Sequence, residues 1–175
     1  MLQGVDVVVD LAALAHDNAA GVFVDTLHGV NVDGTLALAD AAAESGVGRF
    51  IYMSSIGVVG ARNQSPVAEI AAYAPADAYA SSKAEAERGL WRLLDHRMGL
   101  TVIRPPLVYG PNAPGNFGRL LAWARKGRPL PLGAITGNQR SLLGRDNLVD
   151  FILRVLAHPK AANQTFHVAD ERTVS

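Results

Sequence analysis

Tyr79 and Lys83 stand four residues apart in the segment DAYASSKAEAERG, residues 77–89, where a helix is expected to begin. Positions i and i+4 share one face of a helix, so the phenol and the ammonium can lie side by side. A free phenol has a pKa of about 10, and a neighbouring ammonium favours the phenolate and lowers that pKa. The pair would then exchange a proton near neutral pH. The alternative is that Tyr79 packs under a loop and Lys83 is solvated, and the spacing alone does not decide.

Polar residues also stand where the expected strands end: Asp10, the pair Ser54 and Ser55, and Arg104. In an open parallel sheet, ligands bind beyond the carboxyl ends of the strands. A long loop after Ser55 can return the chain to this edge at Tyr79, so that a hydroxyl, a phenol and an ammonium meet in one crevice. With a nicotinamide on the other side of the reacting carbon, such a crevice suits alcohol–ketone interconversion by hydride transfer.

The elements that would position these residues alternate between strands and helices. Short, nearly continuous apolar runs are typical of strands buried on both faces, and they occur at 5–14, 49–55 and 100–106. Helix-like spacing of apolar residues occurs at 23–46, which Gly46 would end, and at 79–97. This alternating order is that of parallel βαβ crossovers, so we expect an α/β fold.

Beyond residue 108 the pattern changes. The expected elements are, in order, a loop rich in Pro, Gly and Asn at 109–118, a helix that ends near Gly127, an irregular stretch at 128–133, a strand at 140–143, a helix with Asp146 as its N-cap and a strand at 165–168. The change of pattern places the end of the first α/β region near residue 108.

Composition excludes several classes of function. The 175 residues are 49% hydrophobic and 18% charged, which fits a globular protein with a core. The formal net charge is zero, so no bulk field draws the chain to nucleic acid or to anionic lipid. The chain has no cysteine, and its five histidines lack metal-ligand spacing, so neither a disulfide nor a metal site is expected. We find no signal peptide or apolar span, and we expect a cytoplasmic protein without a membrane partner.

Four motifs follow one another along the chain: NVDGT (31–35), RFIYMSSIGVVG (49–60), Tyr79-x-x-x-Lys83 and IRPPLVYGP (103–111). Their order and spacing resemble the extended short-chain dehydrogenase/reductases, and above all the nucleotide-sugar epimerases and 4-ketoreductases related to UDP-glucose 4-epimerase. GNFGRLLAWARKGRPLPLG and RSLLGRDNLVDFI extend the likeness over nearly the whole chain. The resemblance implies a Rossmann-type, doubly wound parallel sheet with part of a small substrate-binding region.

The same resemblance implies three regions. Residues 1–108 would form the C-terminal half of an NAD-binding Rossmann domain, 109–143 part of the substrate-binding region, and 144–175 a helix and strand that return to the Rossmann sheet. In the family, about three βα units precede the segment that matches GVDVVVDLAA, and they include the Gly-rich turn that holds the cofactor's pyrophosphate. No such turn is found here. We therefore expect a chain truncated at both ends and inactive alone.

The resemblance also implies roles for individual residues. Tyr79 would be the acid/base, Lys83 its pKa-lowering and ribose-binding partner, and Ser55 the hydroxyl on the sugar oxygen. Asn31 matches the asparagine that steadies the site, although a polar residue that bends the helix is the alternative. Contacts to NAD or NADP are implied, besides Tyr79 and Lys83, for Leu11, Ala12, Ala13, Ser54, Pro106 and Leu107.

For the substrate, a UDP-sugar or related nucleotide sugar, the resemblance points to Asn116 and Arg140 near the diphosphate. An arginine fork suits two phosphate oxygens, but a surface arginine is the alternative. Leu130 and Leu132 resemble the stretch whose backbone meets the uracil ring.

The reaction is narrowed by Ile56 and Gly57, which stand where the 4,6-dehydratases carry an Asp-Glu pair, so a dehydratase is disfavoured. Epimerase and 4-ketoreductase remain open. A different class of hypothesis also remains: a non-catalytic fragment or degenerate paralogue without the dinucleotide-binding loop.

Relatives pair through two helices of each subunit, so a homodimer of the full-length protein is implied. The contacts expected to form it come from Ala37, Ala41, Ala84, Leu90 and Trp91.

Overall fold

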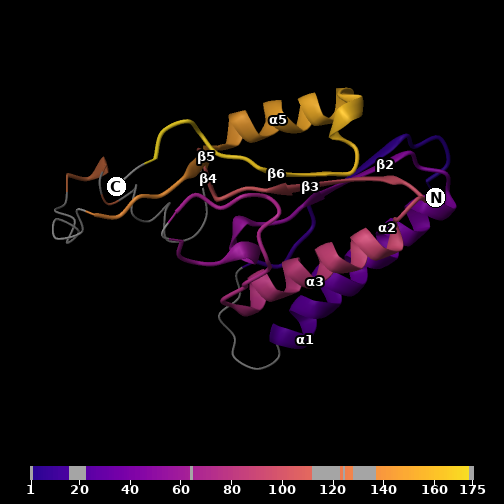
Figure 1. Cartoon of the computed structure of the whole chain (residues 1–175), viewed down its shortest axis with the longest axis horizontal. Helices are drawn as coiled ribbons and strands as arrows, with labels where there is room; N and C mark the ends of the chain where they lie inside the picture. Colours follow the sequence, from indigo (N-terminus) through magenta and orange to yellow (C-terminus); the bar gives the residue numbers. More distant parts are fainter. Residues whose placement is uncertain are drawn as a thin grey trace.

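The computed structural model describes residues 2–15, 23–63, 65–111, 123, 125–127 and 137–173. Its centre is a parallel sheet of four strands in the order β1-β2-β3-β6. The strands are β1 (Val7–Asp10), β2 (Arg49–Met53), β3 (Gly99–Arg104) and β6 (Gln164–His167). Neighbouring strands are parallel throughout, as the expected βαβ order requires. The carboxyl ends of all four strands therefore lie at one edge (Figure 1).

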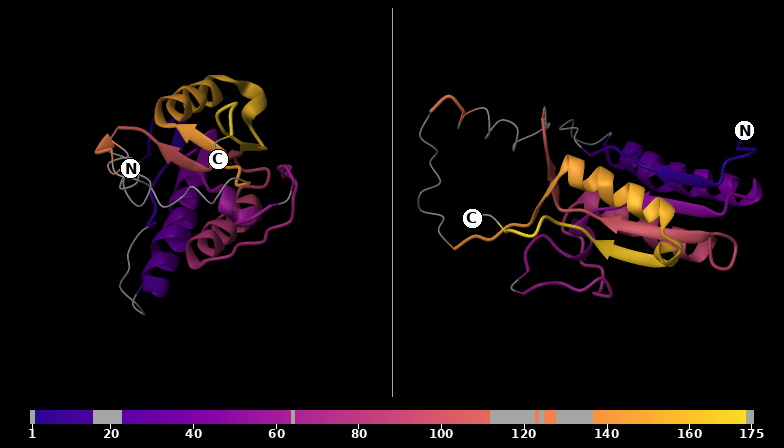
Figure 2. Two further views of the ribbon diagram at one scale, coloured as in Figure 1. Left: turned by 90° about the vertical axis from the view of Figure 1, so that its left-hand side faces the viewer. Right: turned by 90° about the horizontal axis from the view of Figure 1, so that it is seen from above.

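Helices cover both faces of this sheet (Figures 1 and 2). One face carries α1 (Phe23–His28), a π-helical turn (Gly29–Gly34), α2 (Thr35–Glu44) and α3 (Ala78–Leu93). The other face carries α5 (Arg145–Ala157), from which the short 3-10 helix Pro159–Ala161 leads into β6. The expected α/β architecture, a doubly wound parallel sheet, is confirmed.

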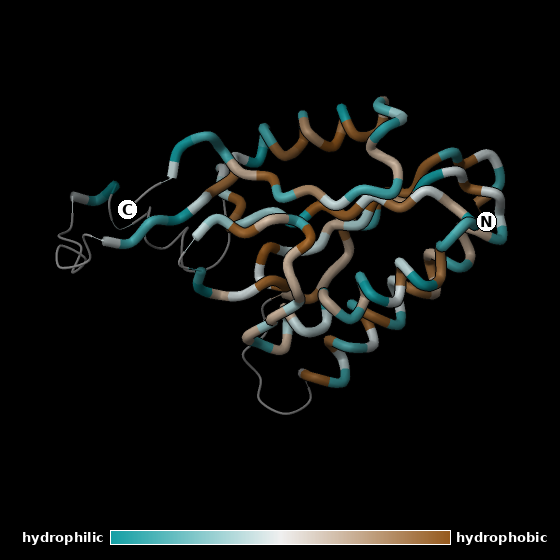
Figure 3. The backbone as a smooth tube through the Cα atoms, viewed as in Figure 1, coloured by the Kyte–Doolittle hydropathy of each residue, from teal (hydrophilic) through white to brown (hydrophobic). Residues whose placement is uncertain are grey.

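Alternate residues of the central strands supply the two halves of the core. Phe50, Tyr52, Leu100 and Val102 pack with α2 and α3, whereas Ile51 and Ile103 pack with Val155 of α5. Figure 3 shows the matching pattern on α5, whose hydrophobic side faces the sheet and whose hydrophilic side faces away. Because successive residues of a strand point to opposite faces, a strand covered on both sides reads as a continuous apolar run. That is the pattern from which these strands were predicted.

Several boundaries differ from the expected ones. The single helix expected at 23–46 is divided by the π-helical turn, although Gly46 does follow its end, with a φ of 77°. The helix expected at 79–97 begins at Ala78, with Asp77 as its N-cap, and ends at Leu93. Asp146 was expected to cap the helix after residue 145, and this was wrong. Gly144 is the N-cap because the preceding strand runs directly into α5, which leaves Asp146 in the first turn.

A second, two-stranded sheet extends the chain beyond the main one. It pairs β4 (Leu107–Tyr109) in parallel with β5 (Leu142–Gly144). The strand expected at 140–143 is thus confirmed with a small shift. Most of the helix expected before Gly127 and the irregular stretch at 128–133 lie outside the described residues. Among the helices that the structure describes, none has the length and apolar character needed to cross a membrane.

Two of the residues expected at a subunit interface belong instead to the core. Ala84 and Leu90 are fully buried within the chain, because they lie on the side of α3 that faces the sheet and its neighbours. They cannot contribute to contacts between subunits. Ala37 and Ala41 on α2 are exposed.

Candidate active site

The candidate site lies where β1, β2 and β3 end and α3 begins. After β2, the chain is fixed to the end of β3 by two backbone hydrogen bonds. Ser54 N donates to Ile103 O at 2.8 Å, and Ile56 N donates to Pro105 O at 3.0 Å. The start of α3 is fixed by its N-cap, because the Asp77 carboxylate accepts a hydrogen bond from Ala80 N at 2.7 Å. The close approach of Gly57 to Ala80 places this first turn of α3 beside the edge at which Ser55 emerges, as expected.

Lys83 is buried, with only 1% of its surface exposed. Its Nζ donates a hydrogen bond to Met53 O at 2.8 Å and lies 4.6 Å from the centroid of the Tyr52 ring. The alternative of a solvated surface lysine is therefore wrong. Burial lowers the pKa of Lys83 to about 8, while the negative charges of Asp10 and then Glu87 raise it.

Tyr79 is half-buried, one helical turn before Lys83. Burial raises the pKa of its phenol, and the charge of Asp77 raises it further. The lowering expected from Lys83 is not found in this structure. The physical reason is the direction of the ammonium, which is hydrogen-bonded to Met53 O below the Tyr52 ring rather than to the phenol. The two residues share a helix face, but Lys83 reaches deeper into the molecule.

Ser55 caps the short 3-10 helix Ile56–Val59. Its Oγ accepts a hydrogen bond from Gly57 N at 3.2 Å, which leaves the hydroxyl proton available for another acceptor. Gly57 lies between Ser55 and α3, where there is little space. A Cβ at this position would lie 3.4 Å from Ser55 Oγ and 3.5 Å from the Cβ of Ala80. The serine hydroxyl therefore lies close to the first turn of the helix that carries Tyr79.

Ser54 points elsewhere. Its hydroxyl is hydrogen-bonded to Glu87, which is fully buried two turns beyond Tyr79 on α3. Glu87 also forms a buried ion pair with Arg104 at 2.6 Å and accepts a hydrogen bond from Tyr73 at 2.8 Å. The hydroxyl proton of Ser54 is thus committed to this group, and a contact of Ser54 with the cofactor stays a prediction.

Asn31 joins two parts of the site. Its fully buried amide accepts a hydrogen bond from Leu14 N at 2.8 Å and donates to Leu14 O and to Ser82 Oγ, each at 3.0 Å. Ser82 directly precedes Lys83, so Asn31 ties the segment after β1 to the helix that carries Tyr79 and Lys83. Asn31 also lies within the π-helical turn, which matches the alternative of a polar residue that bends the helix. Its role beside the cofactor stays a prediction.

Most of the residues expected to contact the cofactor are exposed to solvent at this edge. Leu11, Ala12 and Ala13 are exposed directly after β1, and Leu107 is exposed after β3 with Pro106 half-buried beside it. Of the residues expected at the substrate, Arg140 is exposed next to β5. Asn116, Leu130 and Leu132 lie outside the described residues.

Sequence reasoning gave no role to Asp10, Glu87 or Arg104. Two of these were visible as charged residues that end apolar strands, and Glu87 stands four residues beyond Lys83 on the same helix face. A charge at the end of a run that is buried on both faces is a signal that it must be paired or used.

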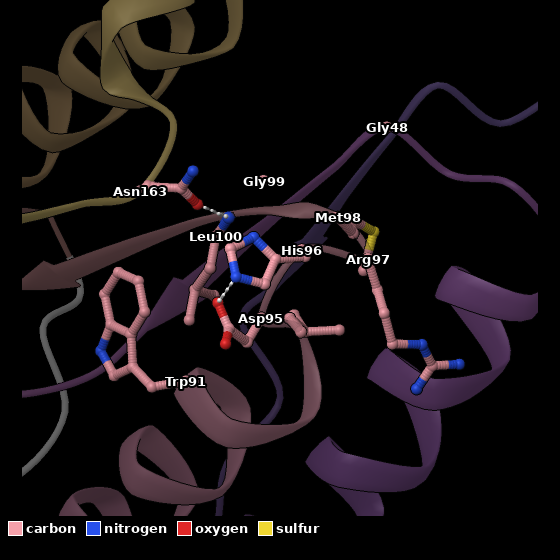
Figure 4. A pocket seen from close by; sticks show the side chains of 10 residues that line it. Gly48, Trp91, Asp95, His96, Arg97, Met98, Gly99, Leu100 and Asn163 are labelled. Atoms are coloured by element: carbon pink, nitrogen blue, oxygen red, sulfur yellow. Dashed lines mark hydrogen bonds and ion pairs between the residues drawn. The ribbon is translucent and has the colours of Figure 1, made fainter.

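A cavity of about 530 Å³ opens at the opposite end of the strands, away from these residues. Figure 4 shows its lining, in which Trp91 of α3 and His96 of the turn after it lie near Asn163 before β6. Asn163 accepts a hydrogen bond from Leu100 N at 3.1 Å, which fixes the start of β3. The titratable groups described above do not reach this cavity.

A doubly wound parallel sheet with a serine, a tyrosine and a buried lysine at its carboxyl edge defines a Rossmann-type protein. Residues 1–169 match the NAD dependent epimerase/dehydratase family, and the chain belongs to that family.

The chain is similar to curated proteins with sugar-epimerase activities. It is 45% identical over 179 residues to UDP-glucose 4-epimerase of Vibrio cholerae, which covers 99% of this chain and 55% of the relative. It is 31% identical over 173 residues to N-acetyl-alpha-D-glucosaminyl-diphospho-ditrans,octacis-undecaprenol 4-epimerase of Escherichia coli O157:H7, with 97% and 51% covered. The chain thus spans about half the length of these relatives.

Solved structures show the same fold. UDP-glucuronic acid 4-epimerase of Bacillus cereus in complex with NAD superposes with a TM-score of 0.87 at 21% identity, over 99% of this chain and 56% of that one. The dTDP-glucose 4,6-dehydratase DesIV of Streptomyces venezuelae, with NAD and TYD bound, gives 0.84 at 26% identity, over 99% and 54%.

Proposed function

We propose that this chain supplies the catalytic edge of an NAD-dependent nucleotide-sugar epimerase or 4-ketoreductase, with Tyr79 as the acid/base at the sugar C4 oxygen. The observation that carries the proposal is the buried ammonium of Lys83, one turn from Tyr79 at the carboxyl edge of the sheet. A buried cation is costly to a fold unless its charge is used or paired. Family membership supports this assignment.

The residues at this edge fit the nicotinamide half of NAD. An ammonium has three N–H donors, and within the described part of the chain Lys83 uses one of them, on Met53 O. Two donors remain, and they would reach ribose hydroxyls once the Lys83 side chain, which is buried in this structure, turns toward the cofactor edge. The exposed backbone of residues 11–13 provides a surface for the dinucleotide, and Pro106 and Leu107 present backbone to the ring. When bound there, the nicotinamide would accept and return a hydride.

The proton would be handled by Tyr79 and Ser55. The Tyr79 pKa is raised, so its phenol is protonated at neutral pH and can donate to a ketone oxygen. The reverse step needs the phenolate, so oxidation of a sugar hydroxyl would become faster as pH rises. Ser55 would hold the same oxygen, because its hydroxyl proton is free to donate while Gly57 N occupies its acceptor side.

A nucleotide sugar is the proposed substrate class. The Vibrio cholerae relative is a UDP-glucose 4-epimerase, and a structure with UDP-glucuronic acid and NAD bound is known for the Bacillus cereus protein of this fold. On this chain, Arg140 is the proposed partner of the diphosphate. Gly57 and Ile56 offer no acid or base beside Ser55, so the proposal does not include elimination of water from the sugar.

A chimaera tests the proposal directly. Residues 1–169 of this chain would replace the matching segment of the Vibrio cholerae epimerase, and epimerisation of UDP-glucose at C4 would be followed. We expect turnover above that of the Lys83→Met chimaera, which lacks the ammonium. A folded chimaera that binds NAD and shows no turnover would contradict the proposal.

We further propose that the complete protein is a homodimer in which Ala37 and Ala41 on α2 lie at the subunit contact. Small exposed side chains let two helices approach closely. Light scattering of the chimaera at tens of micromolar should give the mass of two chains, and Ala37→Arg should reduce it. A monomeric parent chimaera would count against the proposal.

A further inference from the structure

Asp10 is a buried charge with no part in the mechanism above. It is the last residue of β1 and only 3% exposed. One carboxylate oxygen accepts a hydrogen bond from Ala12 N at 3.0 Å, and the other accepts from Thr35 Oγ1 at 3.1 Å. Both donors are neutral, and no basic side chain in the described ranges forms an ion pair with Asp10. Its charge therefore needs another source of balance.

The register of the sheet places Lys83 within reach of that charge. Asp10 is paired with Tyr52 across β1 and β2, and paired residues of a parallel sheet point to the same face. The ammonium of Lys83 lies against the same Tyr52 ring. The Tyr52 hydroxyl is buried and has no hydrogen-bond partner among the described residues, so it satisfies neither charge.

The other charged groups around Lys83 are already matched. Glu87 lies one turn further along α3 and is paired with Arg104 of β3. Tyr79, one turn before Lys83, has a raised pKa and is neutral at pH 7. Of the two carboxylates that raise the pKa of Lys83, Asp10 contributes more. It is also the one without a cation of its own.

We propose that Asp10 is a positioning residue of the cofactor side of the site, which holds the backbone of residues 11–13 through Ala12 and balances the buried charge of Lys83. The proposal rests on the proposed function, since it takes residues 11–13 and Lys83 to meet one dinucleotide. The Asp10 carboxylate then acts on both parts of the cofactor site: it holds the backbone of residues 11–13, and it stabilises the charge of the Lys83 ammonium proposed to bind the ribose. Loss of the Asp10 charge would lower the pKa of Lys83 further.

The ionisation of Lys83 can be measured without turnover. The chain contains three lysines, so labelling with [13Cε]lysine gives three NMR signals, which Lys126→Arg and Lys160→Arg assign. Each signal is titrated between about pH 6 and 11, the range that brackets a lysine whose pKa is lowered. The variant Asp10→Asn keeps an acceptor for Ala12 N but removes the charge, and Asp6→Asn, at the exposed start of β1, is its matched control.

We expect the midpoint of Lys83 to fall by about one pH unit in Asp10→Asn and to stay unchanged in Asp6→Asn. An unchanged midpoint in a folded Asp10→Asn chain overturns the proposal. If Asp10→Asn does not fold, the wild-type chain is titrated instead. The 13Cγ signal of Asp10 should then change at the same pH midpoint as the Lys83 signal. An Asp10 signal that does not change at that midpoint overturns the proposal. The two proposals can fail separately. If the Lys83 midpoint is lowered in Asp10→Asn but the chimaera shows no turnover, the charge balance is upheld and the proposed function is refuted.

Discussion

Lys83 carries its charge where water does not reach it. Burial lowers its pKa from 10.5 to about 8, so between these values the unfolded chain binds more protons than the folded one. The free energy of unfolding therefore rises with pH across that window, and below it the full cost of the buried charge is present. A residue that weakens the fold at neutral pH and yet stands at the carboxyl edge of the sheet is best explained by function.

Removing the charge should accordingly stabilise the chain. We expect Lys83→Met to raise the free energy of unfolding at pH 7 by about 1–3 kcal/mol, less than the full pKa difference because the hydrogen bond to Met53 O is lost and Asp10 is left without a balancing charge. The gain should shrink as pH rises from about 8 and be nearly absent at pH 10.5. Urea unfolding at a series of pH values measures this. A loss of stability at pH 7 would show that Lys83 is a structural cation.

At the scale of elements, α3 is joined to the sheet by one buried ion pair. Glu87 and Arg104 are almost completely buried, and the hydroxyls of Ser54 and Tyr73 converge on the same carboxylate. Arg104 also donates to Glu69 O at 3.0 Å, in the loop that precedes α3. This group sets the position of α3, and with it Tyr79 and Lys83, relative to the ends of β2 and β3.

Breaking the pair from one side should be costly. We expect Glu87→Gln to lower the free energy of unfolding by about 3–5 kcal/mol, because Arg104 keeps an unbalanced buried charge. The double variant Glu87→Leu with Arg104→Met removes both charges and should recover most of that loss. Arg154→Met, at an exposed position of α5, is the matched control for loss of a surface arginine and should change stability by less than about 1 kcal/mol. Equal losses in the single and double variants would mean that the pair does not act as a unit.

The strands, the helices and their order could be predicted because each depends on local pattern. The continuous apolar runs of β1, β2 and β3 record burial on both faces, and Gly46 marks a helix end by its own conformational preference. The convergence of Ser55 and Tyr79 followed from the rule for strand ends. The direction of the Lys83 ammonium could not be predicted, because it is set by Met53 O and the Tyr52 ring on another element. The pairing of Glu87 with Arg104 likewise depends on contacts across the fold.

At the scale of the whole molecule, β1 forms one edge of the described sheet, and the exposed residues 11–13 follow it. The groups at this edge suit the nicotinamide end of the cofactor. A pyrophosphate is commonly held by backbone N–H groups at a helix start that follows a Gly-rich turn. These 175 residues contain no such turn.

The 175-residue chain alone should therefore bind NAD weakly. Calorimetric titration with NAD and NADH should show no saturable binding at micromolar concentrations, and the chimaera should bind under the same conditions. Micromolar affinity with one site per chain would mean that these 175 residues hold the pyrophosphate in another way.

The proton of Tyr79 is the central claim, and the chimaera with the Vibrio cholerae relative allows its direct measurement. Tyr79→Phe keeps the ring and its packing but removes the proton, so kcat should fall by about 10²–10⁴-fold while the affinity for the nucleotide sugar changes little. Tyr109→Phe, which removes an exposed hydroxyl bound to Asp170 at 2.8 Å, is the matched control and should stay within a few-fold of the parent. If Tyr79→Phe also stays within a few-fold, Tyr79 is not the acid/base and the proposed mechanism is wrong.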